Sequence, residues 1–133
     1  MKRICLIVAC QLLCLTSWSQ LKVQQLLCEN LANPRGIARL QPRFSWQLIS
    51  EKRNLMQSAY EIRVSNSATT LNKGTSWSSG KVSSDQSAYV DYQGKPLESG
   101  RVYYWQVRVW DQGGTSTSWS DPSYWQMGLL NPF

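Results

Sequence analysis

The sequence predicts an all-β fold, a sandwich of about seven antiparallel strands, from three observations. The clearest strand covers residues 102–110, where Tyr103, Trp105, Val107 and Val109 alternate with other residues at the period of a half-buried strand. Further short apolar stretches recur along the chain with turn residues between them. From residue 20 onward no stretch favours a helix.

The turn before this strand indicates which sandwich to expect. Gly100 allows a tight turn, and Tyr103 supplies an apolar ring with a hydroxyl. The pattern Leu97-x-x-Gly100-x-x-Tyr103 resembles the tyrosine corner that leads into strand F of immunoglobulin-like and fibronectin type III sandwiches. We therefore expect an immunoglobulin/fibronectin type III-like β-sandwich in which the Tyr103 hydroxyl bonds to backbone upstream.

The other strands are expected on both sides of residues 102–110. Turn chemistry predicts turns at 33–36 and 111–114, and the polar stretch 66–76 predicts a loop. Pro122 indicates that the first half of the last strand lies at an edge or a bulge. The expected strands cover residues 22–28, 42–48, 60–65, 77–82, 87–92 and 119–127.

Residues 1–19 have the layout of a secretory signal peptide, with a basic start, an apolar run over 4–15 and small residues before the cleavage point. The run is too short to span a bilayer. We expect cleavage after Ser19, a secreted or periplasmic domain over 20–130, and no stable membrane insertion afterwards. Lipid attachment at Cys10 is the weaker alternative, because it would leave a very short apolar core.

Cleavage would leave Cys28 as the one cysteine, so no internal disulfide is expected. Cys28 closes an apolar run and is expected to be buried rather than reactive. The net charge of +6 comes from basic residues spread between Lys22 and Arg108 as well as at the start of the chain. Because they are not clustered, no nucleic-acid partner is expected.

The inventory of reactive side chains argues against catalysis. The sequence has no histidine, which excludes Ser-His and Cys-His nucleophilic pairs and the usual zinc ligand. A glycosidase needs two carboxylates that flank a cleft, whereas Asp111 belongs to a turn and Glu61 is expected to point outward beside Arg63. We expect solvated single carboxylates, no catalytic residue, no metal site and no cofactor.

Tryptophan is abundant, and its positions suggest two roles. Trp46 and Trp105 are expected in the core, whereas Trp110, Tyr104 and Trp77 fall on outward or edge positions near Arg108. These outward side chains can dock a neighbouring domain, form an intramolecular cation–π ladder, or stack on a sugar. Domain docking ranks first, and on that hypothesis Trp110→Ser should improve solubility and leave thermal stability nearly unchanged. The candidate docking or sugar-stacking surface is Trp110, Tyr104, Arg108 and Trp77.

Several motifs occur in one order along the chain, and together they resemble the amino-terminal module of secreted bacterial α-L-rhamnosidases. They are Leu26-Leu27-Cys28-Glu29-Asn30-Leu31-x-Asn33-Pro34-x-Gly36-Ile37, Gln41-Pro42-Arg43-Phe44-Ser45-Trp46, Gln57-Ser58-Ala59-Tyr60-Glu61-Ile62-Arg63-Val64, Trp77-x-Ser79-Gly80-Lys81-Val82, Tyr103-Tyr104-Trp105-Gln106-Val107-Arg108-Val109-Trp110-Asp111, Trp119-Ser120-x-Pro122 and Trp125-x-Met127-Gly128-Leu129-Leu130.

The resemblance implies a fibronectin type III-like sandwich ahead of further β domains and an (α/α)₆-barrel that hydrolyses terminal α-L-rhamnosyl bonds with inversion. In that family the catalytic carboxylates lie in the barrel, so none is assigned here. Residues 131–133 would begin a truncated link to a missing next domain. The implied function is a non-catalytic accessory domain whose partners are the downstream domains.

Two other functions remain open at this point. The chain could be a stand-alone carbohydrate-binding or protein-interaction module that uses exposed Trp and Tyr, with plant-type rhamnose-containing glycans as possible ligands. It could also be a small hydrolase itself, which the single carboxylates argue against.

Overall fold

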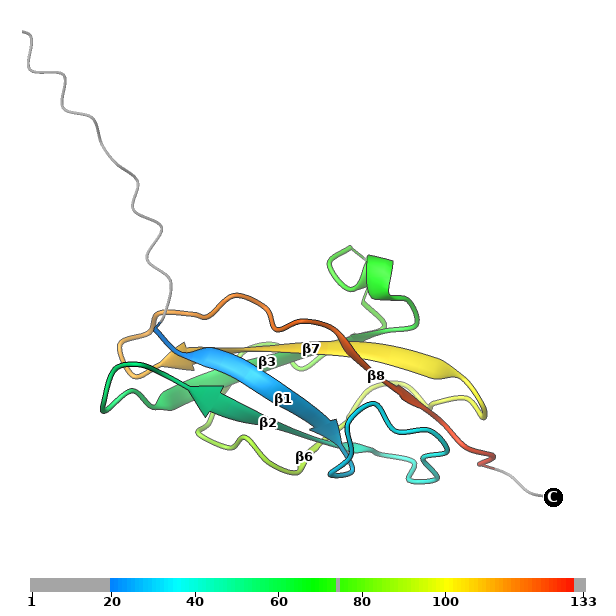
Figure 1. Ribbon diagram of the computed structural model, residues 1–133. Helices are drawn as coiled ribbons and strands as arrows, with labels where there is room; N and C mark the ends of the chain where they lie inside the picture. Colours follow the sequence, from blue (N-terminus) through cyan, green and yellow to red (C-terminus); the bar gives the residue numbers. More distant parts are fainter. Residues whose placement is uncertain (1–19, 74, 131–133) are drawn as a thin grey trace, which may run out of the picture.

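The computed structural model describes residues 20–73 and 75–130, which form two antiparallel sheets packed face to face (Figure 1). The predicted signal peptide over 1–19, the alternative site at Cys10 and the predicted link over 131–133 lie outside the described residues. The three-stranded sheet has the order β1-β2-β6, from β1 (Lys22–Cys28), β2 (Arg43–Ile49) and β6 (Val90–Asp91). This architecture confirms the all-β sandwich.

The five-stranded sheet is built around the strand that the sequence made most prominent. It contains β3 (Gln57–Ser65), β4 (Trp77–Ser78), β5 (Val82–Ser83), β7 (Val102–Asp111) and β8 (Ser123–Gln126). Its order is β4-β3-β7-β8, and β5 also pairs with β3. The two longest strands, β3 and β7, therefore lie side by side at its centre.

Side chains alternate along β7 between buried and half-buried, as its sequence period predicts. Trp105, Val107 and Val109 are fully buried and face the three-stranded sheet. Val64 and Ile62 on β3 lie opposite Trp105 and Val107 in the strand register, so the two strands contribute matched apolar rows to the core.

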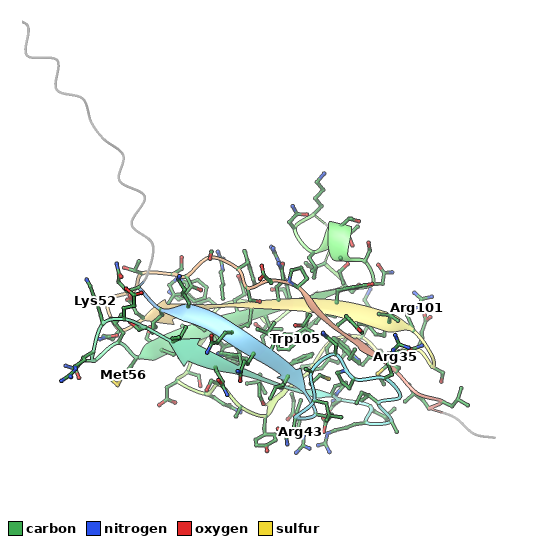
Figure 2. All side chains as sticks on the ribbon, in the orientation of Figure 1. Arg35, Arg43, Lys52, Met56, Arg101 and Trp105 are labelled. Carbon is green, nitrogen blue, oxygen red and sulfur yellow. The ribbon has the colours of Figure 1, made fainter. Side chains whose placement is uncertain are left out.

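Aromatic rings fill the space between the sheets. The Phe44 ring centroid lies 4.5 Å from that of Trp105 and 5.3 Å from that of Trp125. Trp46 is also buried, and its indole nitrogen donates to Gln57 Oε1 at 3.0 Å. The predicted core positions of Trp46 and Trp105 are confirmed, and Figure 2 shows Trp105 in the middle of the sandwich.

The tyrosine corner is present as predicted. The Glu98 backbone N–H donates to the Tyr103 hydroxyl at 2.9 Å, and Gly100 has a φ of +72°, which favours glycine. The hydroxyl therefore satisfies a loop amide while the Tyr103 ring stays buried. This contact fixes the loop that leads into β7.

The last strand is shorter than predicted and begins at Ser123 instead of Trp119. Pro122 has no N–H for a strand ladder, and two hydroxyls take part in the bonding before it. Thr117 Oγ1 accepts from Val109 N at 3.2 Å, and Ser120 Oγ accepts from Val107 N at 3.1 Å. In a regular ladder these two β7 amides would donate to backbone carbonyls, whereas here they donate to side-chain hydroxyls of the segment.

Three other expectations change in detail. The edge strand predicted over 77–82 is divided into β4 and β5, because Gly80 between them has a φ of +64°. The strand predicted over 87–92 is reduced to β6. The predicted loop contains one 3₁₀ turn, Ala68–Thr70, in which the Thr69 amide donates to the Ser67 hydroxyl.

Candidate functional site

The register between β3 and β7 determines which side chains share the outer face of the five-stranded sheet. Opposite pairs on this face are Glu61 with Arg108, Arg63 with Gln106, and Ser65 with Tyr104. Trp110 lies on the same face, opposite Ala59. Three of the four predicted surface residues, Tyr104, Arg108 and Trp110, therefore come from one face of one strand.

Cations and indole rings alternate across this face. Arg63 Cζ lies 3.9 Å from the ring centroid of Trp119, and Arg108 Cζ lies 4.6 Å from the same ring. Arg108 Cζ is also 5.0 Å from the Trp110 ring, which Lys81 Nζ approaches to 4.8 Å. We call these five side chains the cation–π stack. Of the residues in the cation–π ladder that the sequence left as an alternative, Trp110 and Arg108 belong to this stack.

Two further side chains hold the arginines of the stack in place. Arg108 Nη2 is 2.8 Å from Glu61 Oε1, and Arg63 donates from Nε and Nη2 to Gln106 Oε1 at 3.0 and 2.8 Å. Burial, reinforced by the positive charge of Arg108, lowers the pKa of Arg63. Glu61 offsets part of that repulsion, so the two guanidinium groups can share the Trp119 ring.

Three members of the cation–π stack, Trp119, Arg63 and Lys81, are not among the four surface residues that the sequence predicts. The strand predicted over 119–127 was wrong at Trp119, and the pattern gave no reason to place the Trp119 ring over β7. The signal was local: Thr117 and Ser120, whose hydroxyls bond to β7, flank Trp119 and hold the irregular segment against the sheet.

Tyr104 lies further along the same face, where its ring centroid is 6.2 Å from that of Tyr124. It belongs to a separate aromatic pair, because the cations of the stack contact Trp110 and Trp119. Trp77 lies at the lateral edge of the sandwich, in edge contact with Tyr92 at 5.0 Å. The four predicted residues therefore do not form one surface.

A pocket of about 260 Å³ opens beside Trp77, between the edges of the two sheets. Tyr92, which contacts the Trp77 ring, lies in the core, and burial raises the pKa of the Tyr92 phenol to about 12. An indole beside amide and carboxylate side chains is a combination that can accept a polar ring. The lining residues are Tyr60, Trp77, Ser78, Ser79, Val82, Gln86, Tyr89, Val90, Asp91 and Gln93.

Three carboxylates are bonded into the fold. Glu61 pairs with Arg108, and Asp111 Oδ1 accepts from the amides of Gly113 and Thr115 at 2.9 and 3.1 Å. Glu29 Oε1 accepts from Arg43 N, and Glu29 Oε2 lies 2.8 Å from Arg43 Nη2. The expectation of solvated charges was wrong for Glu61 and Glu29, because the fold brings an arginine to each of them. Asp111 bonds the backbone of its own turn, as its turn position predicts.

The ionisation of Glu29 and Cys28 follows from the same surroundings. Burial alone would raise the pKa of Glu29, but its hydrogen bonds to Arg43 and the charges of Arg43 and Arg39 outweigh burial and lower it. Burial, with the negative charge of Glu29, raises the pKa of the Cys28 thiol to about 12. Cys28 is buried as predicted and has the character of a core residue rather than a nucleophile.

Within residues 20–73 and 75–130, no group of three His, Cys, Asp or Glu side chains could hold a metal ion. In the same part of the chain, no helix is long and apolar enough to cross a membrane.

The chain matches proteins of one kind. A family model described as the Rha78A-like, N-terminal immunoglobulin domain matches residues 23–131. An α-L-rhamnosidase of Streptomyces avermitilis is 43% identical over 112 residues, which cover 84% of this chain and 11% of that protein. An α-L-rhamnosidase of Formosa agariphila is 39% identical over 115 residues, with 85% and 12% covered.

Solved structures agree with these relatives. The crystal structure of the Streptomyces avermitilis α-L-rhamnosidase with L-rhamnose has a TM-score of 0.82 at 42% identity, covering 84% of this chain and 11% of that one. The α-L-rhamnosidase from Dictyoglumus thermophilum has a TM-score of 0.79 at 38% identity, covering 83% and 12%. The chain thus spans 11–12% of the relatives that it matches. It belongs to the Rha78A-like family of N-terminal immunoglobulin-like domains of α-L-rhamnosidases.

Proposed function

We propose that this chain is a non-catalytic accessory domain of an α-L-rhamnosidase, which supports the domains that follow it and docks on them. The observation that carries the proposal is the extent of the match. The relatives share this domain over 11–12% of their length, and the family model places it at the amino end. Most of each relative, therefore, has no counterpart in this chain.

The bonding of three carboxylates supports the same role. A glycosidase places one carboxylic acid and one carboxylate on either side of the scissile bond. Glu61 and Glu29 instead form ion pairs with arginines, and Asp111 caps its own turn. To act in catalysis, each of these carboxylates would have to leave its partner, and the loss of that interaction would lower the stability of the domain.

Hydrolysis of an aryl α-L-rhamnoside tests this proposal. We expect no release above blank from the chain alone. A full-length rhamnosidase that carries the domain should hydrolyse the substrate. Deletion of the domain should lower the melting temperature of that enzyme. Turnover by the isolated chain that Glu61→Gln abolishes would make the chain a hydrolase. An unchanged melting temperature after deletion would contradict the supporting role.

A second candidate function is carbohydrate binding, favoured by the pocket beside Trp77. Its indole and the neighbouring Gln86 and Asp91 provide a stacking surface and hydrogen-bonding groups for a sugar. Plant-type rhamnose-containing glycans are the ligands to titrate while following tryptophan fluorescence. Saturable quenching that disappears in Trp77→Ala and persists in Trp110→Ala would support this function. Fluorescence that does not change with glycan would contradict it.

The location of the protein is a separate proposal. The layout of residues 1–19 supports export and cleavage after Ser19. Mass spectrometry of the secreted and periplasmic fractions should find a chain that starts at Gln20. A lipid-modified chain that starts at Cys10 would replace this proposal with lipoprotein processing.

A further inference from the structure

Residues 127–130 leave the sandwich through a set of backbone contacts that fix their direction. Ile37 and Met127 form a parallel bridge, in which Ile37 N donates to Gln126 O at 3.0 Å and Gly128 N donates to Ile37 O at 2.8 Å. From the other side, Gly100 N donates to Gly128 O at 3.2 Å. The departing chain is therefore held between two loops.

Two details tighten this contact. A Cβ on Gly128 would lie 3.2 Å from the backbone carbon and oxygen of Gly36, closer than most such contacts, so glycine permits the approach. One step further, Leu130 N donates to Ser99 Oγ at 2.9 Å. Residues up to Leu130 are thus part of the body of the domain rather than a flexible tether.

The end of the sandwich where this happens exposes aliphatic side chains. Leu129 follows the bridged Met127 by two residues, and Leu40 lies in the loop between the bridged Ile37 and the start of β2 at Arg43. Leu129 is 82% exposed and Leu40 66% exposed. Leu31, in the hairpin that ends β1 at the same end, is 56% exposed. We call Leu31, Leu40 and Leu129 the exit end.

Positive charge lies near these leucines. Figure 2 shows Arg35 and Arg101 at the end of the molecule toward which the chain departs, with Met56 and Lys52 at the other end. Arg101 pairs with Glu98 in a contact that stays open to solvent, with side-chain exposures of 47% and 63%. A surface that covers this end should therefore be apolar at its centre and able to accept hydrogen bonds from guanidinium groups at its rim.

The relatives indicate what covers it. They are α-L-rhamnosidases of which this domain forms 11–12%, and the domain stands at their amino end. In this chain, the contacts described above hold Leu130, and the exposed Leu129 directly precedes it. The exit end is therefore the exposed surface next to the last described residue, whereas the outer sheet face carries the cation–π stack, whose rings already have partners.

We propose that the exit end is the docking surface for the next domain of the same rhamnosidase polypeptide, held at a fixed angle to this one. The proposal rests on the accessory function proposed above and assigns its contact to a surface. The sequence had favoured Trp110, Tyr104, Arg108 and Trp77 for that contact. The docking surface is instead aliphatic, and the partner covers Leu40 and Leu129.

Thiol labelling in two contexts tests the proposal. Single variants Leu40→Cys and Leu129→Cys are compared with the matched controls Ile49→Cys and Met56→Cys, since Ile49 and Met56 are also exposed aliphatic positions, at 48% and 65%. Cys28 is a silent background, because it is buried and the pKa of its thiol is raised to about 12. Each variant is labelled with maleimide in the isolated chain and in a chimaeric enzyme. In that chimaera residues 20–130 replace the matching domain of the Streptomyces avermitilis relative, and preparations that hydrolyse an aryl rhamnoside are used.

We expect labelling at Leu40→Cys and Leu129→Cys to slow by about tenfold or more in the chimaera, and labelling at Ile49→Cys and Met56→Cys to keep its rate. Equal slowing at both ends, or at neither, would overturn the proposal. If labelling slowed at Trp110→Cys instead, the assignment of docking to the exit end would be wrong, and the accessory function would still stand. If no position on the domain slowed, docking itself and the proposed function would both fall.

Two measurements on the isolated chain complete the test. The amides of Gly128 and Leu130 should exchange with solvent more slowly than unstructured amides, and exchange at the unstructured rate would contradict the fixed exit. Labelling at Leu40→Cys should not depend on chain concentration. Protection that grows with concentration would assign the exit end to a second copy of the chain and overturn the proposal.

Discussion

The outer face of the five-stranded sheet and the exit end differ in whether their large outward side chains have contacts within the domain. On the outer face, Trp110 and Trp119 lie against cations that are themselves bonded to Glu61 and Gln106. At the exit end, Leu40 and Leu129 project from loops at 66% and 82% exposure. A large aromatic residue on an outward strand position can therefore make its contacts within the domain, while smaller aliphatic residues in loops stay exposed to solvent.

Removal of Trp119 tests most directly whether the outer face stabilises the domain. Its ring contacts both Arg63 and Arg108, and it lies in the segment that Thr117 and Ser120 fasten to β7. We expect Trp119→Ala to lower the free energy of unfolding by about 2–3 kcal/mol, somewhat less than for a fully buried Trp. Denaturant unfolding measures this. A loss below about 0.5 kcal/mol would show that the stack does not stabilise the domain.

Trp110→Ser should have a smaller effect, because Trp110 lies at the end of the stack between Lys81 and Arg108. The sequence alone favoured a nearly unchanged stability. With these contacts in view, we expect a loss of about 1–2 kcal/mol. Lys81→Met is the matched control, since it removes one cation and keeps the ring, and it should cost about 0.5 kcal/mol. An unchanged unfolding midpoint for Trp110→Ser would restore the original docking hypothesis for this residue.

Most of the fold could be predicted because its strands carry a clear period. Residues 22–28 form β1 as expected, and β7 and the tyrosine corner follow from one pattern around Gly100 and Tyr103. Strand edges were less predictable. β6 contains two residues, and at that length alternation gives no signal above chance.

The candidate site was harder to predict because it depends on contacts between distant segments. A strand pattern shows that Arg108 and Trp110 face outward, but it does not show that Trp119 lies over Arg108. Likewise, the register that brings Glu61 opposite Arg108 depends on pairing between strands far apart in sequence. The exit end depends on a parallel bridge between Ile37 and Met127, which no local pattern encodes.

Acid should weaken the domain through Glu29, beside the exit end. The pKa of this carboxyl is lowered in the native state, because bonds and charges from Arg43 and Arg39 outweigh burial. Its contribution to stability is therefore complete above the unfolded value near 4.5 and is lost as the pH falls through the lower native value. We expect Glu29→Gln to be less stable than wild type at neutral pH and to show a flatter decline in acid. Parallel curves for the two proteins between pH 6 and about pH 2 would contradict this role.

The smallest effect on stability should come from the exit end itself. The double variant Leu40→Ser with Leu129→Ser removes two exposed side chains, so the free energy of unfolding of the isolated chain should change by no more than about 0.5 kcal/mol. Ile49 is the last residue of β2 and Met56 precedes β3, so the pair Ile49→Ser with Met56→Ser lies where β2 leads into β3, and it should behave alike in the isolated chain. The two pairs should separate only inside the enzyme, where the exit-end pair lowers the melting temperature and the control pair does not. Because both pairs remove similar exposed aliphatic area, such a difference would arise from what covers each end and not from the domain. If both pairs lowered the melting temperature equally, the exit end would have no special contact with the rest of the polypeptide.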